Sequence, residues 1–247
     1  MMYKGFANVY DHMMENIPYE EWCSKLKLYL KEHGLAEGRI CELGCGTGIM
    51  TEKFAKAGYQ MIGLDKSVDM LALARQKQEE TKSDILYLNQ DMKEMELDKS
   101  VDACISVCDS MNYLLQEEEM SALFERVKKY LTPGGLFIFD LKTVYCYRNV
   151  IGNQTWVEQD EEVSYIWENF FYEDQDINEY MLTIFRKQPD SNLYERMEEA
   201  HYQRAYSPER LKSLLAEAGL TLVDSFDEDM ENPIRENSER IYLIAKN

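Results

Sequence analysis

Two hydrophobic periods alternate along the first 141 residues of the chain, one typical of helices and the other of buried strands. Apolar residues recur every three or four positions in the helical segments, and short apolar runs separate these segments. Helices are expected around 6–14, 22–30, 48–57, 67–78 and 116–131, and strands around 39–43, 59–64, 85–89, 101–107 and 136–141. This alternation favours a parallel sheet that is covered by helices.

The pattern changes after Lys142. Three segments alternate in the manner of an antiparallel ribbon, at Val163–Glu173, Ile177–Gln188 and Leu193–Tyr206. A helix is expected from Ser207 to Gly219, followed by strands at 220–226 and 240–245. The sequence therefore predicts an α/β fold with seven strands in its main sheet and a β-rich insertion. The expected divisions are 1–141 (N-terminal lid helices and cofactor-binding part), 142–206 (insertion) and 207–247 (last helix and strands).

The charge of the chain narrows the range of partners. Its 27 basic and 46 acidic side chains give a formal net charge of −19. Such a surface repels phosphate backbones and anionic lipids, so nucleic acid and membrane are disfavoured as partners. No apolar run approaches the roughly 20 residues that span a bilayer, and residues 1–14 are too polar for a signal peptide. We expect a cytoplasmic chain whose six cysteines are free thiols.

A glycine-rich segment, CELGCGTG, follows the first predicted strand and places Gly44, Gly46 and Gly48 before a helix. Glycines at this position let a ligand approach bare backbone at the carboxyl end of a sheet. Asp65 ends the second strand, where a carboxylate can bind a ribose diol. These features indicate a cofactor that contains a nucleoside. The spacing G-x-G-x-G differs from the dinucleotide pattern G-x-G-x-x-G, and a purely structural turn is the alternative.

Four motifs in order resemble the class I S-adenosylmethionine-dependent methyltransferases. Segment 42–48 resembles the family's motif I, and 63–67 its ribose-binding acidic turn. Segment 89–92 resembles the strand end that contacts adenine, and 131–136 the turn before the fifth strand. The resemblance covers residues 39–141, and the last two strands are similar to the family's terminal hairpin. It implies a Rossmann-like fold and S-adenosyl-L-methionine as the cofactor.

The resemblance also implies roles for individual residues. Glu42 organises the glycine loop or receives the ammonium group of the methionine moiety, Asp65 accepts from the ribose hydroxyls, and Asp91 accepts from the adenine amino group. The full implied set of cofactor-binding residues is Tyr3, Glu42, Gly44, Cys45, Gly46, Gly48, Asp65, Lys66, Met70, Asp91, Met92 and Cys108.

Residues 6–11 are similar to the lid helix of small bacterial methyltransferases, including amino-sugar N-methyltransferases. By this likeness Tyr3 and Tyr10 border the cofactor, and the alternative is that Tyr10 only completes the apolar face of a helix. Asp109 follows the fourth strand, where a base would lie. The segment there is not the Asn/Asp-Pro-Pro-Tyr sequence of many methyltransferases that act on planar amino groups.

Further candidates for the acceptor site are His201, Arg204 and Tyr206, near the return of the ribbon to the core. A lone histidine in a strand is more often structural than catalytic, and His12 and His33 are expected at the surface. Cys41, Cys45, Cys104 and Cys108 can approach one another on neighbouring strands, but we expect core thiols and no metal site.

The sequence predicts methyl transfer to a nitrogen or oxygen of a small-molecule acceptor. Alternatives are methylation of a protein or tRNA, a non-catalytic cofactor-binding module and, disfavoured by the glycine spacing, an oxidoreductase. The aromatic residues of the ribbon cover the acceptor, pack on the core or form a homodimer surface, and we favour the first. They are Tyr165, Trp167, Phe170, Tyr172, Tyr180 and Phe185.

Overall fold

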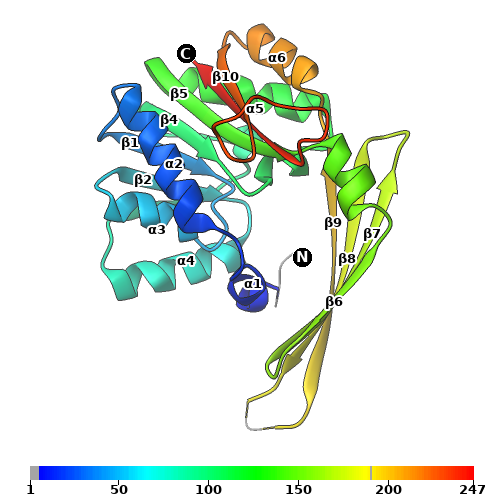
Figure 1. Ribbon diagram of the computed structural model, residues 1–247. Coiled ribbons are helices and arrows are strands. Elements are labelled where there is room, and N and C mark those ends of the chain that lie inside the picture. Colours follow the sequence, from blue (N-terminus) through cyan, green and yellow to red (C-terminus); the bar gives the residue numbers. More distant parts are fainter. Residues whose placement is uncertain (1–5, 190) are drawn as a thin grey trace.

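The computed structural model describes residues 6–189 and 191–247, and its centre is a seven-stranded sheet (Figure 1). The strand order is β10-β11-β5-β4-β1-β2-β3. Strands β1 to β5 are parallel, and β10 and β11 form an antiparallel hairpin beside β5. The bounds are β1 Arg39–Leu43, β2 Gln60–Asp65, β3 Ile85–Asn89, β4 Val101–Ser106, β5 Leu131–Lys142, β10 Thr221–Asp227 and β11 Arg240–Lys246. The predicted fold class is confirmed.

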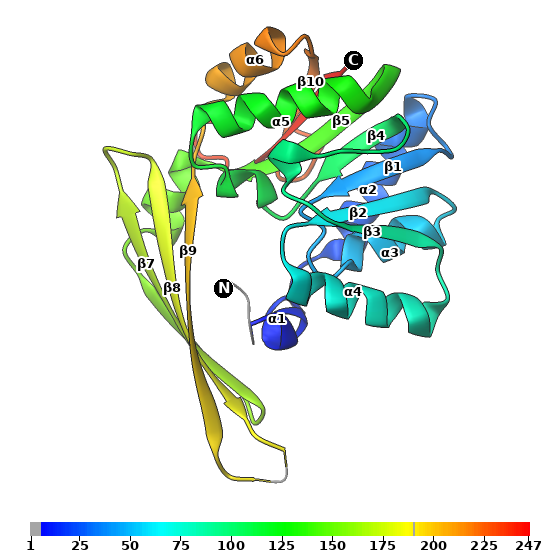
Figure 2. The same ribbon diagram turned by 180° about the vertical axis from the view of Figure 1, so that it is seen from behind.

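Helices cover both faces of this sheet (Figures 1 and 2). One face packs α2, α3 and α4 around residues such as Leu26 and Phe54, and the other packs α5 and α6 around Phe124. Successive β5 residues alternate between the two cores, as the pleat of a strand requires: Phe137 faces one and Ile138 the other. The bounds are α2 Tyr19–Glu32, α3 Ile49–Lys56, α4 Val68–Thr81, α5 Glu117–Tyr130 and α6 Pro208–Glu217.

Local signals set most of these boundaries. Ser67 and Ser207 begin α4 and α6, each accepting a backbone hydrogen bond from three residues ahead. The fifth strand differs from its prediction because it starts at Leu131, which pairs with Val101, rather than at Leu136. The expected Pro-Gly-Gly turn is an irregularity inside the strand, where the register between β4 and β5 shifts.

The insertion is a separate antiparallel sheet in the order β6-β7-β8-β9. Its strands are β6 Thr155–Gln159, β7 Val163–Tyr172, β8 Ile177–Lys187 and β9 Tyr194–Arg204, preceded by a helical turn, η3, at Cys146–Ile151. Three strands match the predicted ribbon. The sequence pattern missed β6 because it has five residues and little burial, so its alternation is short.

Helix α1 (Ala7–Met13) lies between the core and the insertion sheet (Figures 1 and 2). Phe6 and Val9 pack in one apolar cluster with Met70 of α4 and with Leu182 and Ile184 of β8. The helix therefore joins the two parts of the molecule beside the carboxyl ends of the parallel strands.

Candidate active site

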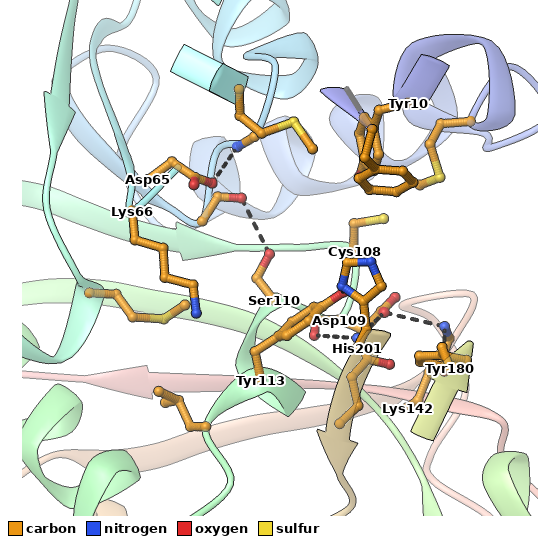
Figure 3. Close-up of a pocket in the computed structure, with 18 of the residues that line it drawn as sticks. Tyr10, Asp65, Lys66, Cys108, Asp109, Ser110, Tyr113, Lys142, Tyr180 and His201 are labelled. Carbon is orange, nitrogen blue, oxygen red and sulfur yellow. Dashed lines mark hydrogen bonds and ion pairs between the residues drawn. The ribbon is translucent and has the colours of Figure 1, made fainter. Parts of the chain in front are cut away.

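A cavity of about 370 Å³ lies between the carboxyl ends of the parallel strands, α1 and the insertion sheet (Figure 3). Gly44, Gly46, Asp65, Asp91 and Met92 line one part of it. Another part is lined by Asp109, Lys142, Tyr180, His201 and Gln203. The fold thus brings residues of the glycine loop and of the ribbon, far apart in sequence, into one space.

Glycine is required at the three positions of the loop for different structural reasons. All have positive φ angles, which glycine adopts without strain. At Gly46 a Cβ atom would meet nothing within 4 Å, so its backbone is open to a ligand. At Gly44 a Cβ would lie 2.7 Å from the side chain of Ser110, and at Gly48 2.4 Å from the Tyr87 hydroxyl. Gly48 lies outside the cavity lining, contrary to expectation, and makes room for Tyr87 instead.

Asp65 is fixed at the end of β2 by two backbone donors. The N–H groups of Gly46 and Ser67 donate to different oxygens of its carboxylate, each at 2.8 Å. Burial raises the pKa of Asp65 above its usual value. The carboxylate faces the cavity in Figure 3, in a position suited to the hydroxyls of a ribose.

Further cofactor candidates line the same part of the cavity. Asp91 begins a short helix, η1 (Met92–Glu94), by accepting from the backbone N–H of Lys93 at 3.2 Å. Met92, Met70 and Lys66 also line the cavity. Open backbone, an anchored carboxylate and apolar side chains fit an adenosyl group.

A smaller cavity of about 30 Å³ continues from the glycine loop and is lined by Glu42, Cys45, Cys108, Tyr10 and Tyr19. Tyr19, which the sequence analysis did not select, has its hydroxyl 3.9 Å from the sulfur of Cys108. This end of the site offers one carboxylate and two phenol groups, which suits the amino-acid part of the cofactor.

Glu42 is unusual because it is a buried acid at the end of a core strand. Its side chain is 3% exposed and accepts a hydrogen bond from Thr51 of α3. Burial raises the pKa of Glu42 to about 8, and repulsion from Asp65 adds to the rise. A buried carboxyl without a cationic partner costs folding free energy, which argues for a functional role.

The chain after β4 takes an uncommon path. Cys108 and Asp109 have φ angles of 62° and 54°, in the left-handed region that residues other than glycine seldom adopt. Asp140, fully buried on β5, holds this path by accepting from both backbone N–H groups, at 3.0 and 2.7 Å. The segment continues into a short helix, η2 (Ser110–Tyr113).

The Asp109 carboxylate is the centre of a buried charge network. Arg240 donates to it at 2.8 Å, the Gln203 amide at 2.8 Å and the Lys142 ammonium at 3.2 Å. Burial alone would raise the pKa of Asp109, but attraction to Lys142 and Arg240 holds that pKa well below its usual range. A carboxylate so strongly satisfied is a poor proton acceptor.

Among the residues of this network, only Asp109 is a candidate from the sequence. Gln203 belongs to β9 of the insertion, whereas Lys142 and Arg240 belong to β5 and β11. The Lys142 ammonium also lies 3.4 Å from the hydroxyl of Tyr180 on β8. The network therefore connects the loop after β4 to the insertion sheet.

His201 lies on the inward face of β9, directly opposite Tyr180 in the register with β8. It is buried, lines the cavity and has its Nδ1 atom 3.4 Å from the Tyr113 hydroxyl (Figure 3). Burial lowers the pKa of His201 to about 4, and the positive charge of Lys66 contributes. The imidazole is therefore neutral at neutral pH.

Two expected acceptor-site residues do not line the cavity. The Arg204 guanidinium donates to the Leu115 carbonyl at 2.9 Å, and the Tyr206 hydroxyl donates to the Leu114 carbonyl. The guanidinium also lies over the Tyr206 ring, 5.1 Å from its centre. Their expected place in the acceptor pocket is wrong, because these contacts hold both side chains against the segment that precedes α5. Tyr3 lies outside the described residues.

The aromatic residues of the ribbon divide between its two faces. Tyr165, Trp167 and Tyr180 line the cavity, whereas Phe170 and Tyr172 are on the opposite face and are exposed. Tyr10 of α1 lines both cavities and also belongs to the apolar cluster of α1. Tyr10 therefore belongs to the apolar face of its helix, and its role beside the cofactor stays a prediction.

All six cysteines are free thiols, and Cys41 and Cys104 are register partners on β1 and β4. His12 and His33 are at the surface, as expected. In the part of the chain that the structure describes, no helix is long and apolar enough to cross a membrane.

Helix α1 is held over the cavity by polar contacts at both sides. Asp11 accepts a hydrogen bond from Thr47 of the glycine loop and forms an ion pair with Lys77 of α4. His12 forms an ion pair with Asp160, which lies between β6 and β7. These contacts hold α1 against both the core and the insertion sheet.

The His12–Asp160 contact should depend on pH. Its hydrogen bond to Asp160 raises the pKa of His12, so the stabilisation is present below the usual histidine pKa of about 6.5 and is lost as the pH rises through the raised value. We expect amide-exchange protection of α1, corrected for intrinsic rates, to fall from pH 6 to 8. His12→Gln should abolish this dependence.

His33→Gln is the matched control, because His33 is at the surface and stacks on Tyr29 away from α1. It should leave the pH dependence of α1 intact. Equal protection of α1 in the unmodified protein at pH 6 and 8 would contradict the proposed contact.

Comparison with known proteins identifies relatives along the whole chain. The family described as "Methyltransferase domain" matches residues 40–135. A putative methyltransferase of Geobacillus sp. (strain WCH70) is 36% identical over 247 residues, which is 100% of both chains. A dTDP-3-amino-3,6-dideoxy-alpha-D-glucopyranose N,N-dimethyltransferase of Streptomyces fradiae is 26% identical over 141 residues, or 56% of this chain and 54% of that protein.

Solved structures extend the likeness to the insertion sheet. An S-adenosylmethionine-dependent methyltransferase from Clostridium acetobutylicum has a TM-score of 0.89 and 28% identity, covering 99% of this chain and 98% of that chain. CalS10, an amino pentose methyltransferase from Micromonospora echinaspora solved with its cofactor, has a TM-score of 0.76 and 16% identity, covering 100% and 98%. The second likeness concerns the fold alone.

Proposed function

The chain belongs to the class I S-adenosylmethionine-dependent methyltransferases, and we propose that it methylates a nitrogen or oxygen of a small-molecule acceptor. One observation carries this proposal: a single cavity joins the residues suited to the cofactor to the inward face of the insertion sheet. An acceptor on that face would share one cavity with the cofactor.

The cofactor supplies a methyl group on a sulfonium, which is transferred in line to a nucleophile. The protein's tasks are therefore to bind, to align and to exclude water. In this proposal Asp65 and Asp91 bind the nucleoside, and Glu42 binds the amino-acid end. Helix α1 covers the cavity, and the charge network of Asp109 holds the loop after β4 in position. In this proposal Asp109 is a positioning group.

We propose that His201 accepts the proton that the acceptor loses when it is methylated. A nucleophilic hydroxyl or amine becomes more acidic as its bond to the methyl group forms, and a nearby neutral imidazole can then accept the proton. The neutral state of His201 and its place in the cavity wall opposite Tyr180 support this role. The amino-sugar methyltransferases among the relatives favour nitrogen as the methylated atom.

The shape of the site weighs against a macromolecular acceptor. The cavity is covered by α1 and the insertion sheet, and the net charge of −19 opposes RNA. If the protein were a non-catalytic binding module, it would bind the cofactor but would not transfer its methyl group.

A screen of amino sugars, small amines and hydroxylated metabolites, scored by S-adenosylhomocysteine formation, tests the proposal. We expect turnover with a member of these classes. For that acceptor, His201→Phe should lower kcat by roughly 10²- to 10⁴-fold without changing the affinity for S-adenosylhomocysteine. His33→Phe is the control and should leave kcat unchanged. Turnover only with protein or tRNA fractions would overturn the small-molecule assignment.

A further inference from the structure

The insertion sheet has a second face, turned away from the cavity, which we call the outer face. Along β8, partly exposed and buried residues alternate from Ile177 to Phe185. The buried set includes Tyr180 and Leu182, which line the cavity, so the partly exposed set points to the opposite side. The helical turn η3 packs on the inward side, against Phe171. Figures 1 and 2 show α1 and the core on that side too, and among the described residues no helix lies over the outer face.

The outer face is more apolar than the solvent side of an antiparallel sheet usually is, since such a side normally carries polar residues. Val157 is 67% exposed, Phe170 and Tyr172 are each 43% exposed, and Tyr202 is 40% exposed. Strand alternation places these side chains together with partly buried ones on neighbouring strands. The apolar members include Val157, Ile166, Phe170, Tyr172, Met181 and Tyr202. An exposed apolar patch that extends over several strands marks a site of association.

Most charges of the outer face are matched within the same chain. The Glu179 carboxylate accepts hydrogen bonds from the hydroxyls of Tyr172 and Tyr202, at 2.6 and 2.7 Å. Arg196 and Glu198 form an ion pair at 2.6 Å. The face therefore does not depend on a partner of opposite charge.

The dimensions of the outer face suit a second copy of the chain. Strands β7, β8 and β9 have 10, 11 and 11 residues. At about 3.3 Å per residue and about 4.8 Å between strands, they present a face of roughly 500 Å². Two such faces would bury roughly 1,000 Å² or more, which reaches the size of a specific interface. Twisted antiparallel sheets pack face to face in this way in β-sandwiches.

We propose that the chain forms a homodimer in which the outer faces of two insertion sheets pack against each other about a two-fold axis. This symmetry brings the same patch together from both copies, so it requires a face that complements itself. Glu168 is the remaining carboxylate of the face, and an axis that lies away from it keeps its two copies apart. The same strands line the cavity with their other side, so the interface would also hold the cavity wall. The dimer does not depend on the identity of the methyl acceptor.

Sedimentation equilibrium of the full-length protein is the first test. It is made at physiological salt, which screens the repulsion between two chains of net charge −19. We expect the mass of two chains. Phe170→Glu should weaken the association by roughly 100-fold or more, because the symmetry places the new charge in the interface twice. Leu28→Glu, at an exposed position of α2, is the matched control and should sediment as the unmodified protein does. A cooperative melt verifies that each variant is folded.

Hydroxyl-radical footprinting of the unmodified protein is the second test and requires no substitution. Tyr172, Met181 and Tyr202 should be oxidised more slowly at a concentration where the dimer predominates than after dilution, whereas Leu28 should be oxidised equally at both. A protein that stays monomeric, a dimer that a folded Phe170→Glu variant retains, or equal oxidation of the outer face at both concentrations overturns the inference. If Phe170→Glu does not fold, the footprint decides.

Discussion

Asp109→Asn should lower the free energy of unfolding by about 3–5 kcal/mol and reduce methyl transfer to background. Removing one partner of a buried ion pair leaves uncompensated charge. Here Lys142 would lose its ion pair with Asp109, and Arg240 would keep only the one with Asp140. The loop through Cys108, which lines both cavities, would keep its backbone contacts with Asp140 but would lose the charged contacts that tie Asp109 to β5 and β11. Denaturant unfolding and the S-adenosylhomocysteine assay measure the two effects.

Asp98→Asn is the matched control, since the Asp98–Arg39 pair is at the surface with Asp98 63% exposed. It should change the free energy of unfolding only slightly, because solvent screens this exposed pair. The pKa of Asp109 is depressed in the folded protein. The contribution of its carboxylate to folding stability is therefore present above the usual carboxyl pKa and is lost only as the pH falls through the lowered value. The Asp109→Asn deficit should therefore persist from pH 5 to 8, and a deficit as small as that of Asp98→Asn would contradict the network's role.

Glu42→Gln should stabilise the protein at pH 8 while weakening cofactor binding. The pKa of Glu42 is raised to about 8 by burial, so the unfolded chain releases this proton near pH 4.5 and the folded chain retains it. Each pH unit between these values removes about 1.4 kcal/mol of stability, several kcal/mol in total. Glutamine abolishes this loss, but it cannot ionise to receive an ammonium group. S-adenosylhomocysteine affinity should fall by roughly 1–3 kcal/mol.

Glu52→Gln tests whether these effects belong to the site. Glu52 is buried on α3 and accepts hydrogen bonds from Thr81 and Ser83, but it lines neither cavity. Its replacement should leave S-adenosylhomocysteine affinity unchanged. If Glu42→Gln binds as tightly as the unmodified protein, Glu42 is a structural residue of the loop.

The sheet and the cofactor half of the site follow from sequence because their determinants are local. A strand, three glycines and a strand-ending Asp65 lie close together in the chain, and the parallel order of the strands places them at one edge. The caps at Ser67 and Ser207 likewise act within one helical turn.

The acceptor half depends on contacts between distant segments and could not be predicted in the same way. Gln203 meets Asp109 across 94 positions of sequence, and Arg240 meets it across 131. Strand alternation places Gln203 and Arg204 on opposite faces of β9, but it does not say which of the two faces meets the core, and we expected Arg204 in the pocket. The direction of the side chain depends on where β9 lies against the core.

Calorimetry with S-adenosylhomocysteine tests the central claim most directly, that Asp65 and the glycine loop form the cofactor site of a methyltransferase. We expect binding to the unmodified protein, weakened by roughly 1–3 kcal/mol in Asp65→Ala through the loss of hydrogen bonds to the ribose diol. Tight binding of NAD with no response to S-adenosylhomocysteine, or equal S-adenosylhomocysteine affinity in Asp65→Ala, would contradict it.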